Sequence, residues 1–596
     1  MHIKISEKDL LESFPWKIYP RIRNVQKEAL EIIPNGSAIF EAPTGSGKTA
    51  IGMTFLKALL QKGARTVIYA TITKAQASQI KAWFPEVKVV FGRNEYRCSF
   101  YQGKVTAEDA PCTVLDCPHR IDDSGQTKEP DVEPCSYLQA RYEANQGGII
   151  VCTVAFYLLV KLFAKNKEWK TVDGLVFEEA HRVARMARNC LKWEITDYHL
   201  KRNIELLERI DVDEALVLKK FLRKMMRIVK KRKDLGPTLL EDEEIQALLE
   251  ELLDIDSQKL LNKVKEAVEK RLIDPVEERE TLKKLETIAH EIPRYVRAFE
   301  YSLETEERKP LSFTYGFYVK TLSPRQRVQY KLVVQSYYVA PIIRKISSPY
   351  TLAYSATIGD PNVFAFETGI DAPFHSFASE FPVKNTRIFL PTDTPNLSFR
   401  MRRKRDPQKA LRIIAEKCRY LASHGIRSLV IVISEFERER FLNCCQRLEV
   451  DCISYGNGIK PREAIEAFKE GKAKVLVGTA ANFGEGIDLP KQLAPAIFFL
   501  RPGYPRPRDP SAEFEKRRFG ESMCWKLWNW RVMIEALQVR GRNVRSARDL
   551  GVTFFISQQF RNFLYSSLPE WLKDAYNGKQ TLDDTVKETV QLVEQE

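Results

Sequence analysis

Residues 42–49, Ala-Pro-Thr-Gly-Ser-Gly-Lys-Thr, constrain the fold of this chain more than any other segment. They follow the apolar run Ser37–Phe40 and lead into Lys48–Gln61, where apolar residues recur at helical spacing. A glycine-rich turn between a strand and a helix lets backbone N–H groups wrap a phosphate, while the lysine reaches the β- and γ-phosphates and the threonine hydroxyl holds Mg²⁺. We therefore predict a nucleotide-binding loop made of Ala42, Pro43, Thr44, Gly45, Ser46, Gly47, Lys48 and Thr49.

The chain has 596 residues and a formal net charge of +15, from 94 Lys and Arg against 79 Asp and Glu. This length favours several domains, and the positive charge suits a surface that binds a polyanion, although it also serves solubility. The best apolar run, Ile149–Val160, is shorter than a membrane span, and the N-terminal residues are charged. We expect a cytoplasmic protein that acts as a monomer and has no membrane partner.

Four of the eleven cysteines lie within 38 residues: Cys98, Cys112, Cys117 and Cys135. Their segment is rich in Gly, Pro, Asp and Ser and lacks apolar periodicity, so it cannot build a core of its own. Ligation of one metal centre by four thiolates would supply the missing free energy. The gaps of 13, 4 and 17 residues match no common zinc finger, whereas an iron–sulfur cluster accepts irregular spacing. His119 is the alternative, zinc-type ligand.

A buried strand with two acidic residues at its carboxyl end is predicted over residues 174–181, which read Gly-Leu-Val-Phe-Glu-Glu-Ala-His. The carboxyl ends of parallel strands form the ligand-binding edge of a sheet. At this position Glu178 would orient Mg²⁺, Glu179 would polarise the attacking water, and His181 would couple the site to neighbouring loops. Glutamate is one methylene longer than the aspartate usual at the first position. Either the backbone therefore adapts to Glu178 or ATP turnover is impaired.

About 150 residues after His181 are strongly charged, nearly free of glycine and periodic in Leu, Ile and Val at helical spacing. This composition and this periodicity predict a helical insertion. A basic run, Lys219–Lys233, lies within it. Such a run either grips phosphates or forms a solvated helix face, and the two interpretations are equally well supported by the sequence.

Strand and helix patterns alternate again after the helical insertion, which predicts a second α/β unit from about Asp406. Thr351–Tyr354 leads into Ser-Ala-Thr at 355–357, and a strand at Lys474–Thr479 ends in a glycine-rich loop with two acids. Paired arginines three residues apart, near residue 540, can neutralise charge that develops on a transferred phosphoryl group. We expect Glu485, Gly486 and Asp488 in the nucleotide site, and Lys48, Glu178, Glu179, His181, Gln538, Arg542 and Arg545 in catalysis.

The order of these motifs resembles the XPD/DinG family of superfamily 2 iron–sulfur helicases over nearly the whole chain. The shared motifs are the phosphate loop, the four cysteines, Glu-Glu-Ala-His, Ser-Ala-Thr, Gly-Glu-Gly-x-Asp and Gln-x-x-Gly-Arg-x-x-Arg. The resemblance implies an α/β fold with two RecA-like (P-loop) motor domains and two inserted domains. The implied boundaries are 1–92, 141–195 and 347–390 for motor domain 1, 93–140 for the Fe–S domain (the four-Cys insert), 196–346 for the helical arch (the helical insertion) and 391–596 for motor domain 2.

The resemblance also implies a function and a set of ligands. The implied cofactors are ATP, Mg²⁺ on Thr49 and Glu178, and a [4Fe–4S] cluster on the four cysteines, and Arg23 and Gln26 would sense adenine. The implied activity is 5′→3′ translocation on single-stranded DNA and unwinding of forked DNA in DNA repair. Two alternatives are a slow ATP-gated module that binds or remodels nucleic acid, motivated by Glu178, and an RNA helicase. Candidate residues for stacking on bases are Tyr504, Trp525, Trp528 and Trp530. For any single tryptophan among them, a place in the core is the better-supported interpretation.

Overall fold

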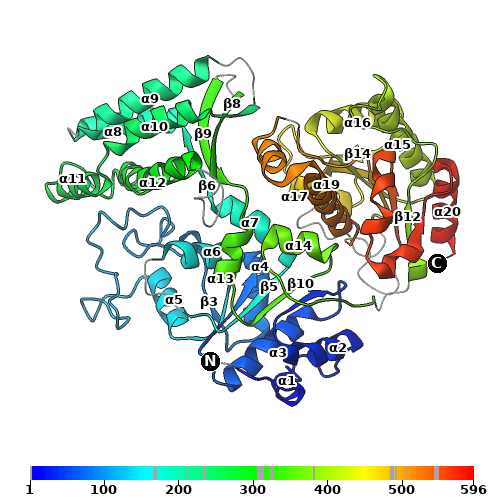
Figure 1. The fold of residues 1–596 in the computed structure, drawn as a ribbon, viewed down its shortest axis with the longest axis horizontal. Helices are drawn as coiled ribbons and strands as arrows, with labels where there is room; N and C mark the ends of the chain where they lie inside the picture. Colours follow the sequence, from blue (N-terminus) through cyan, green and yellow to red (C-terminus); the bar gives the residue numbers. More distant parts are fainter. Residues whose placement is uncertain are drawn as a thin grey trace.

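The computed structural model describes residues 3–164, 169, 171–210, 213–231, 236–304, 314–322, 328–379, 383–483, 489, 493–506, 508–541 and 549–595. These residues form two seven-stranded sheets and one four-stranded sheet. Figure 1 shows the two larger sheets in separate bodies, with the helical insertion beside them. Two α/β bodies of the expected kind are therefore present.

The first seven-stranded sheet pairs its strands in parallel, in the order β11-β1-β10-β5-β2-β4-β3. Helices cover both of its faces, each over its own apolar cluster. The strands are β1 (Ala38–Glu41), β2 (Thr66–Thr71), β3 (Lys88–Val89), β4 (Gly148–Thr153), β5 (Gly174–Glu178), β10 (Thr351–Ser355) and β11 (Phe374–Ser376). The helices are α1 (Glu7–Ser13), α2 (Asn24–Ile32), α3 (Lys48–Gln61), α4 (Lys74–Trp83), α5 (Ser136–Asn145), α6 (Val154–Phe163), α7 (Val183–Cys190), α13 (Ala340–Ile346) and α14 (Pro361–Thr368).

The register of the central strands decides where the predicted site residues lie. Glu41 at the end of β1 is level with Ser355 at the end of β10, and Tyr354 of β10 is level with Glu178 at the end of β5. Because all three strands are parallel, their carboxyl ends meet at one edge of the sheet. The phosphate loop, the acidic pair and the Ser-Ala-Thr segment are therefore neighbours, although more than 300 residues separate the first from the last.

The second seven-stranded sheet is also parallel, in the order β14-β15-β13-β16-β17-β12-β18. Its strand β12 starts at Thr386, so the second sheet includes residues that we expected, up to 390, in motor domain 1. The strands are β12 (Thr386–Phe389), β13 (Ser428–Val432), β14 (Cys452–Ile453), β15 (Val475–Thr479), β16 (Ala496–Phe499), β17 (Gly551–Phe555) and β18 (Tyr576–Asn577). The helices are α15 (Asp406–Ser423), α16 (Glu435–Arg447), α17 (Pro461–Lys469), α18 (Ala480–Phe483), α19 (Pro510–Arg540) and α20 (Leu582–Glu594).

Helix α19 is interrupted at Gly520, whose φ of 75° and ψ of 163° are not helical. Before the interruption, the Phe514 ring stacks on Tyr337 at 5.4 Å and the Phe519 ring meets Tyr338 edge-on at 5.3 Å. After it, Trp530 joins the apolar cluster of the first sheet. One helix of the second body thus contacts both the chain leaving the helical insertion and the first sheet.

The helical insertion contains five helices packed on one apolar core, together with a four-stranded antiparallel sheet in the order β6-β9-β8-β7. We expected helices alone, and the structure adds this sheet, in which β8 and β9 form a hairpin and β6 pairs with β9 across more than 100 residues. The elements are β6 (Lys192–Thr196), α8 (Asp197–Arg209), α9 (Glu214–Lys230), β7 (Gly236–Leu239), α10 (Asp242–Leu253), α11 (Ser257–Glu269), α12 (Arg279–Leu303), β8 (Thr314–Leu322) and β9 (Val328–Ser336). Among the described helices of the whole chain, none is both long and apolar enough to cross a membrane.

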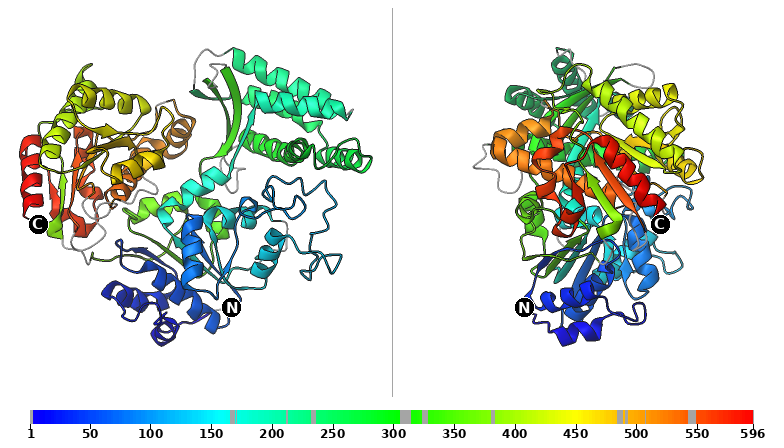
Figure 2. Two further views of the ribbon diagram at one scale, coloured as in Figure 1. Left: turned by 180° about the vertical axis from the view of Figure 1, so that it is seen from behind. Right: turned by 90° about the vertical axis from the view of Figure 1, so that its right-hand side faces the viewer.

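The four-Cys insert has little regular structure before α5, as its composition predicts. Figure 2 shows its winding trace next to the helical insertion. Hydrogen bonds join the two. The Tyr101 hydroxyl donates to the Pro275 carbonyl (2.7 Å), the Thr113 N–H donates to the Glu286 carboxylate (2.7 Å), and the Arg279 guanidinium donates to the Asp109 carbonyl (2.9 Å). The Thr113 hydroxyl also lies 3.2 Å from His290 Nε2. The insert is therefore held from outside as well as by its own residues.

Candidate functional site

The phosphate loop has the backbone that its sequence predicts. Gly45 and Gly47 adopt left-handed φ values of 84° and 78°, which residues with a β-carbon rarely adopt. The Lys48 ammonium folds over the loop and donates to the carbonyls of Ala42 (2.9 Å) and Pro43 (3.1 Å). The loop is thus preformed, with its cation placed across the turn where phosphates would bind.

Gln26 supports the phosphate loop from behind. Its side chain is fully buried, and its amide N–H donates to the Gly47 carbonyl (3.3 Å) while its carbonyl accepts from the Arg23 backbone N–H (2.9 Å). A β-carbon on Gly47 would lie 2.1 Å from the Gln26 amide nitrogen. A side chain at position 47 would therefore displace the Gln26 amide, in addition to the backbone strain set by its left-handed φ.

The Tyr69 hydroxyl brings together the two residues that we expected to hold Mg²⁺. It is hydrogen-bonded to the Tyr354 hydroxyl in the buried centre of the first sheet. Burial raises the pKa of Tyr69, the neighbouring Glu178 charge adds to this rise and Thr49 opposes it, so both residues lie close to its hydroxyl. Oxygen Oε2 of Glu178 is buried without a hydrogen-bond partner among the described residues. A buried carboxylate oxygen beside a threonine hydroxyl is a donor set that suits a hard divalent cation.

Burial raises the pKa of Glu178 to about 7, the negative charge of Glu179 adds to this rise, and the Lys48 cation opposes it. Without a cation, two neighbouring carboxylates in a dry site disfavour full ionisation. Glu179 itself adopts a left-handed backbone (φ 51°, ψ 49°), which is strained for a residue with a β-carbon. The acidic pair is therefore arranged at an energetic cost that cation binding would relieve.

A chain of hydrogen bonds leads from the acidic pair to the second body. The Ser355 hydroxyl donates to Glu179 Oε2 (2.9 Å) and accepts from the Thr357 N–H (3.1 Å), and His181 Nδ1 lies 2.7 Å from the same hydroxyl. The Thr357 hydroxyl accepts from the Gln538 amide (2.7 Å) at the end of α19. The Ser-Ala-Thr segment thus links the predicted catalytic carboxylate to a residue of the second body.

Sequence reasoning missed Glu41, which fixes this segment in place. Glu41 is buried at the end of β1, directly before the phosphate loop. Its carboxylate accepts from the N–H groups of Ile358 (2.8 Å) and Gly359 (2.9 Å) and from the Ser376 hydroxyl (3.0 Å). A carboxylate within an apolar strand was the available signal, because such a group needs buried donors.

A second missed residue, Arg540, lines a cavity of about 50 Å³ together with Pro43 and Thr44 of the phosphate loop. Arg540 is buried, its guanidinium donates to the Thr386 hydroxyl (3.1 Å), and burial lowers its pKa to about 10. The cavity is too small for a nucleotide, so we expect the two bodies to separate here when one binds. Arg542, Arg545, Glu485, Gly486 and Asp488 lie outside the described residues.

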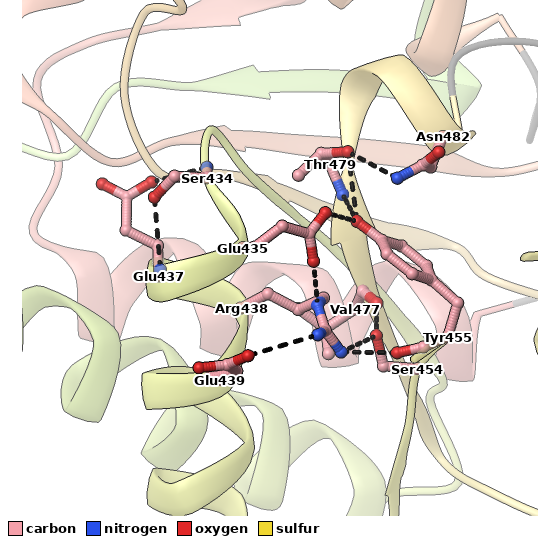
Figure 3. Close-up of polar contacts among 10 residues, drawn as sticks. All are labelled: Ser434, Glu435, Glu437, Arg438, Glu439, Ser454, Tyr455, Val477, Thr479 and Asn482. Carbon is pink, nitrogen blue, oxygen red and sulfur yellow. Dashed lines mark hydrogen bonds and ion pairs between the residues drawn. The ribbon is translucent and has the colours of Figure 1, made fainter. Parts of the chain in front are cut away.

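A polar network orders the carboxyl edge of the second sheet (Figure 3). The Tyr455 hydroxyl donates to the Glu435 carboxylate (2.7 Å) and lies 3.2 Å from the Thr479 hydroxyl, which accepts from the Asn482 amide (3.2 Å). The Arg438 guanidinium lies over the Tyr455 ring and donates to Glu435 (2.6 Å). The network fixes α18, the helix that leads into the predicted nucleotide loop at 484–488.

A buried ion network joins the two bodies. The Glu367 carboxylate on α14 accepts a hydrogen bond from Arg188 on α7 (2.6 Å). It also accepts from Nε (3.1 Å) and Nη2 (3.0 Å) of Arg531. The remaining Arg531 nitrogen, Nη1, donates to Glu515 (2.7 Å). Only 6% and 4% of the Glu367 and Glu515 side chains are exposed, so the pairs are barely screened by solvent. Arg188 and Arg531 hold the pKa of Glu367 at about 2 despite burial, which by itself would raise it.

Two of the candidate stacking residues are core residues, which is the interpretation that the sequence favours for any single tryptophan. Trp528 and Trp530 are buried and donate their indole N–H groups to Glu515 (2.6 Å) and to the Ile358 carbonyl (2.7 Å). Trp525 keeps 42% of its surface exposed. Next to Trp530, a cavity of about 240 Å³ opens between the bodies and is lined by four arginines: Arg182, Arg185, Arg188 and Arg531. Glu367 and Glu535 also line this cavity, and Arg188 and Arg531 are paired with Glu367, so its lining carries both signs of charge.

The four cysteines of the insert come close enough to influence one another. Burial raises the pKa values of Cys112 and Cys117, and the charges of Cys98 and Cys135 add to the rise in both. Glu286 also raises the pKa of Cys112, and Cys112 that of Cys117. The Arg93 guanidinium donates to the Cys112 sulfur (2.8 Å), as it would to a thiolate ligand. Within the described ranges, however, no group of three or more His, Cys, Asp or Glu side chains is assembled to hold a metal ion.

Comparisons with known proteins agree with this arrangement. A family model described as "Type III restriction enzyme, res subunit" matches residues 20–206, and a helicase C-terminal domain model matches residues 423–575. The solved structure "XPD_Helicase" is similar over 94% of this chain and 100% of its own, with 14% identity and a TM-score of 0.60. "Structure of S. tokodaii Xpd4" has the same coverage, 14% identity and a TM-score of 0.57. No curated protein sequence matches the chain. The chain therefore shares the fold of these XPD structures and contains a region that matches a helicase C-terminal domain, in agreement with the predicted resemblance.

The ion network predicts how stability depends on pH. Because the folded pKa of Glu367, about 2, lies below its ordinary value of 4.5, its contribution is complete above pH 4.5 and disappears as the pH falls towards 2. Glu367→Gln should lower the free energy of unfolding by about 3 kcal/mol at neutral pH, and the difference from the parent protein should shrink below pH 4.5. Denaturant unfolding across this range measures both.

Glu12→Gln is the matched control, because Glu12 forms an exposed pair with Lys8 at 3.8 Å and should change stability by less than about 1 kcal/mol. A Glu367→Gln difference that stays constant across the pH range would contradict the assigned charge network.

Proposed function

We propose that this chain, an XPD/DinG-type superfamily 2 helicase, hydrolyses ATP to translocate 5′→3′ on single-stranded DNA and to unwind forked DNA in DNA repair. The observation that carries the proposal is the hydrogen-bond chain from Glu179 through Ser355 and Thr357 to Gln538. This chain connects the predicted catalytic carboxylate to the opposite motor domain. Such a link is what a motor needs to convert a change in the nucleotide site into a domain movement.

In the proposed nucleotide site, the loop N–H groups and Lys48 hold the phosphates, Thr49 and Glu178 hold Mg²⁺, and Arg23 and Gln26 lie on the adenine side. A cation held by Thr49 and Glu178 would supply positive charge near the transferred phosphoryl group. Glu179 accepts a proton from the attacking water, and Ser355 and His181 keep its carboxylate oriented. Arg542 and Arg545 are proposed as the cations that complete the site from the second motor domain, with Glu485, Gly486 and Asp488 next to them.

In the four-Cys insert, we assign Cys98, Cys112, Cys117 and Cys135 as ligands of a [4Fe–4S] cluster. Electrostatic coupling among the thiols and the Arg93 bond to Cys112 support a shared site. Ligation would bring the thiolates into contact and contribute folding free energy to a segment with a small apolar cluster. Contacts of the insert with α12 support a joint role of both inserted parts in separating strands.

Glu178 favours a second candidate, a module whose binding to nucleic acid is gated by ATP and which hydrolyses ATP slowly. The buried carboxylate with a pKa of about 7 would be partly protonated at neutral pH unless a cation is bound. RNA in place of DNA is a further alternative. ATPase assays with single-stranded DNA, with RNA and with neither distinguish these candidates from the helicase.

The motor assignment predicts two distinct failures. Lys48→Ala should reduce ATPase activity by at least about 100-fold, because the phosphates lose their cation. Glu179→Gln should reduce turnover by about 100-fold or more while ATP stays bound, because the water loses its base. Steady-state ATPase and nucleotide-retention assays measure the two effects. Wild-type rates in both variants would contradict the motor assignment.

The length of Glu178 predicts the effect of shortening it. Glu178→Asp should keep or raise DNA-stimulated turnover, because aspartate restores the usual distance to the cation. Glu178→Gln is the control of equal length and should lose turnover. A severe loss in Glu178→Asp would show that the backbone and the Tyr69 contact are adapted to glutamate. Turnover across a Mg²⁺ titration separates weaker cation binding from slower chemistry.

The cluster assignment predicts about four irons per chain in protein purified without oxygen, with broad visible absorbance. Cys112→Ser should remove the iron and abolish duplex unwinding, while DNA-independent ATPase activity persists because the motor domains have their own cores. Cys190→Ser, which changes a half-buried cysteine on α7, should keep the iron. One tightly bound zinc in colourless protein would overturn the assignment.

A further inference from the structure

The exposed face of α9 carries a row of positive charges. Lys220, Arg223, Arg227 and Lys230 are spaced three, four and three residues apart, so they share one face of the helix, and all four are exposed. We refer to these four residues as the cationic stripe. The opposite face of α9 packs into the core of the helical insertion through Leu218, Phe221, Met225 and Val229.

The cationic stripe has no compensating charge among the described residues. None of its four members forms an ion pair there. The one acidic residue of α9, Glu214, is buried and faces Lys259 (3.8 Å) and Lys263 (3.6 Å) of α11. Lys219, beside the stripe, is paired with Glu208 of α8. The positive charge of the stripe therefore remains available to a ligand.

Neighbouring helices show what an ordinary solvated face looks like in this domain. On α11, Lys265 lies near Glu269 (3.9 Å), and on α12, Lys284 lies near Glu280 (3.8 Å), each four residues apart. Like charges at this spacing destabilise a helix, so a row of cations alone is unfavourable for folding. The helix C-terminus favours cations and accounts for Arg227 and Lys230, but Lys220 lies in the first half of α9.

We propose that the cationic stripe binds the phosphate backbone of the duplex arm of a forked DNA substrate. This inference rests on the proposed function. Figures 1 and 2 show α9 at the outer edge of the helical insertion, away from the two large sheets. The helix that carries the stripe is therefore remote from the two proposed motor domains. The row is roughly 15 Å long by the helical rise, and duplex DNA presents a phosphate about every 1.7 Å along its axis.

The absence of aromatic side chains on the stripe favours duplex DNA over a single strand. Surfaces that bind single strands combine cations with aromatic rings on which bases stack. Phe221 is the one aromatic residue of α9, and it is buried. Contacts to phosphates alone fit a paired helix, whose bases are already stacked.

The test replaces the four residues in the variant K220Q/R223Q/R227Q/K230Q, since glutamine keeps helix propensity. Affinity is measured for forked DNA and for single-stranded DNA of the tail sequence, across a salt series. Affinity for the fork should fall at least about ten-fold at 50 mM salt, and the slope of log K against log [salt] should decrease by about 2 to 4. Affinity for the single strand should stay within about two-fold, because the variant leaves the two proposed motor domains unchanged.

Two variants control for charge. K4Q/K17Q/K579Q/K587Q removes the same charge at exposed positions elsewhere and should keep the affinity for the fork. K220R/R223K/R227K/K230R keeps the charges and should behave as the parent protein. The melting temperature of the glutamine variant at low salt should equal or exceed that of the parent protein, because like-charge repulsion is removed.

Unchanged affinity and slope in the glutamine variant would overturn the proposal and leave a solvated face or an acidic protein surface as the explanation. An equal loss for single-stranded DNA would also overturn it, in favour of a single-strand contact. If the parent protein binds neither DNA, the proposed function itself fails, which is a different result from a loss confined to the variant.

Discussion

Parallel pairing of β10 with both β1 and β5 is the constraint on which the site depends. The pairing places Glu41, Glu178 and Ser355 at one edge, although their strands come from widely separated parts of the sequence. Everything inserted between these strands must leave and return without disturbing their register. The four-Cys insert and the helical insertion both meet this condition, because each leaves the first sheet and returns to it between neighbouring strands in the chain.

The sequence predicted the residues that contact ligands better than the residues that hold them in place. The phosphate loop and the acidic pair were visible because their spacing is local and their chemistry is specific. Tyr69 and Glu41 were not, since their roles depend on contacts across hundreds of residues. The pairing of β6 with β9 in the helical insertion was missed for the same reason. Trp528 and Trp530 show that a large aromatic residue near a motif can belong to the core, as we expected for any single tryptophan.

Both inserted parts depend on each other for their structure. The four-Cys insert has a small apolar cluster that includes Val268 of the helical insertion, and Val114 of the insert joins the core of that insertion. With Tyr101 bonded to Pro275 and Thr113 bonded to Glu286, the insert has anchors besides its thiols. A cluster in the insert would therefore also influence the position of α12.

The interruption of α19 at Gly520 bears on which sequences this architecture can tolerate. A backbone with φ near 75° and ψ near 163° is open almost exclusively to glycine, and no atom lies within 4 Å of where a β-carbon would stand. The restriction is therefore set by conformation and not by space. Homologous sequences should therefore retain glycine at position 520, even though there is space for a side chain there. Replacing it would favour one straight helix, and Phe514 and Gln538 could no longer both reach their partners.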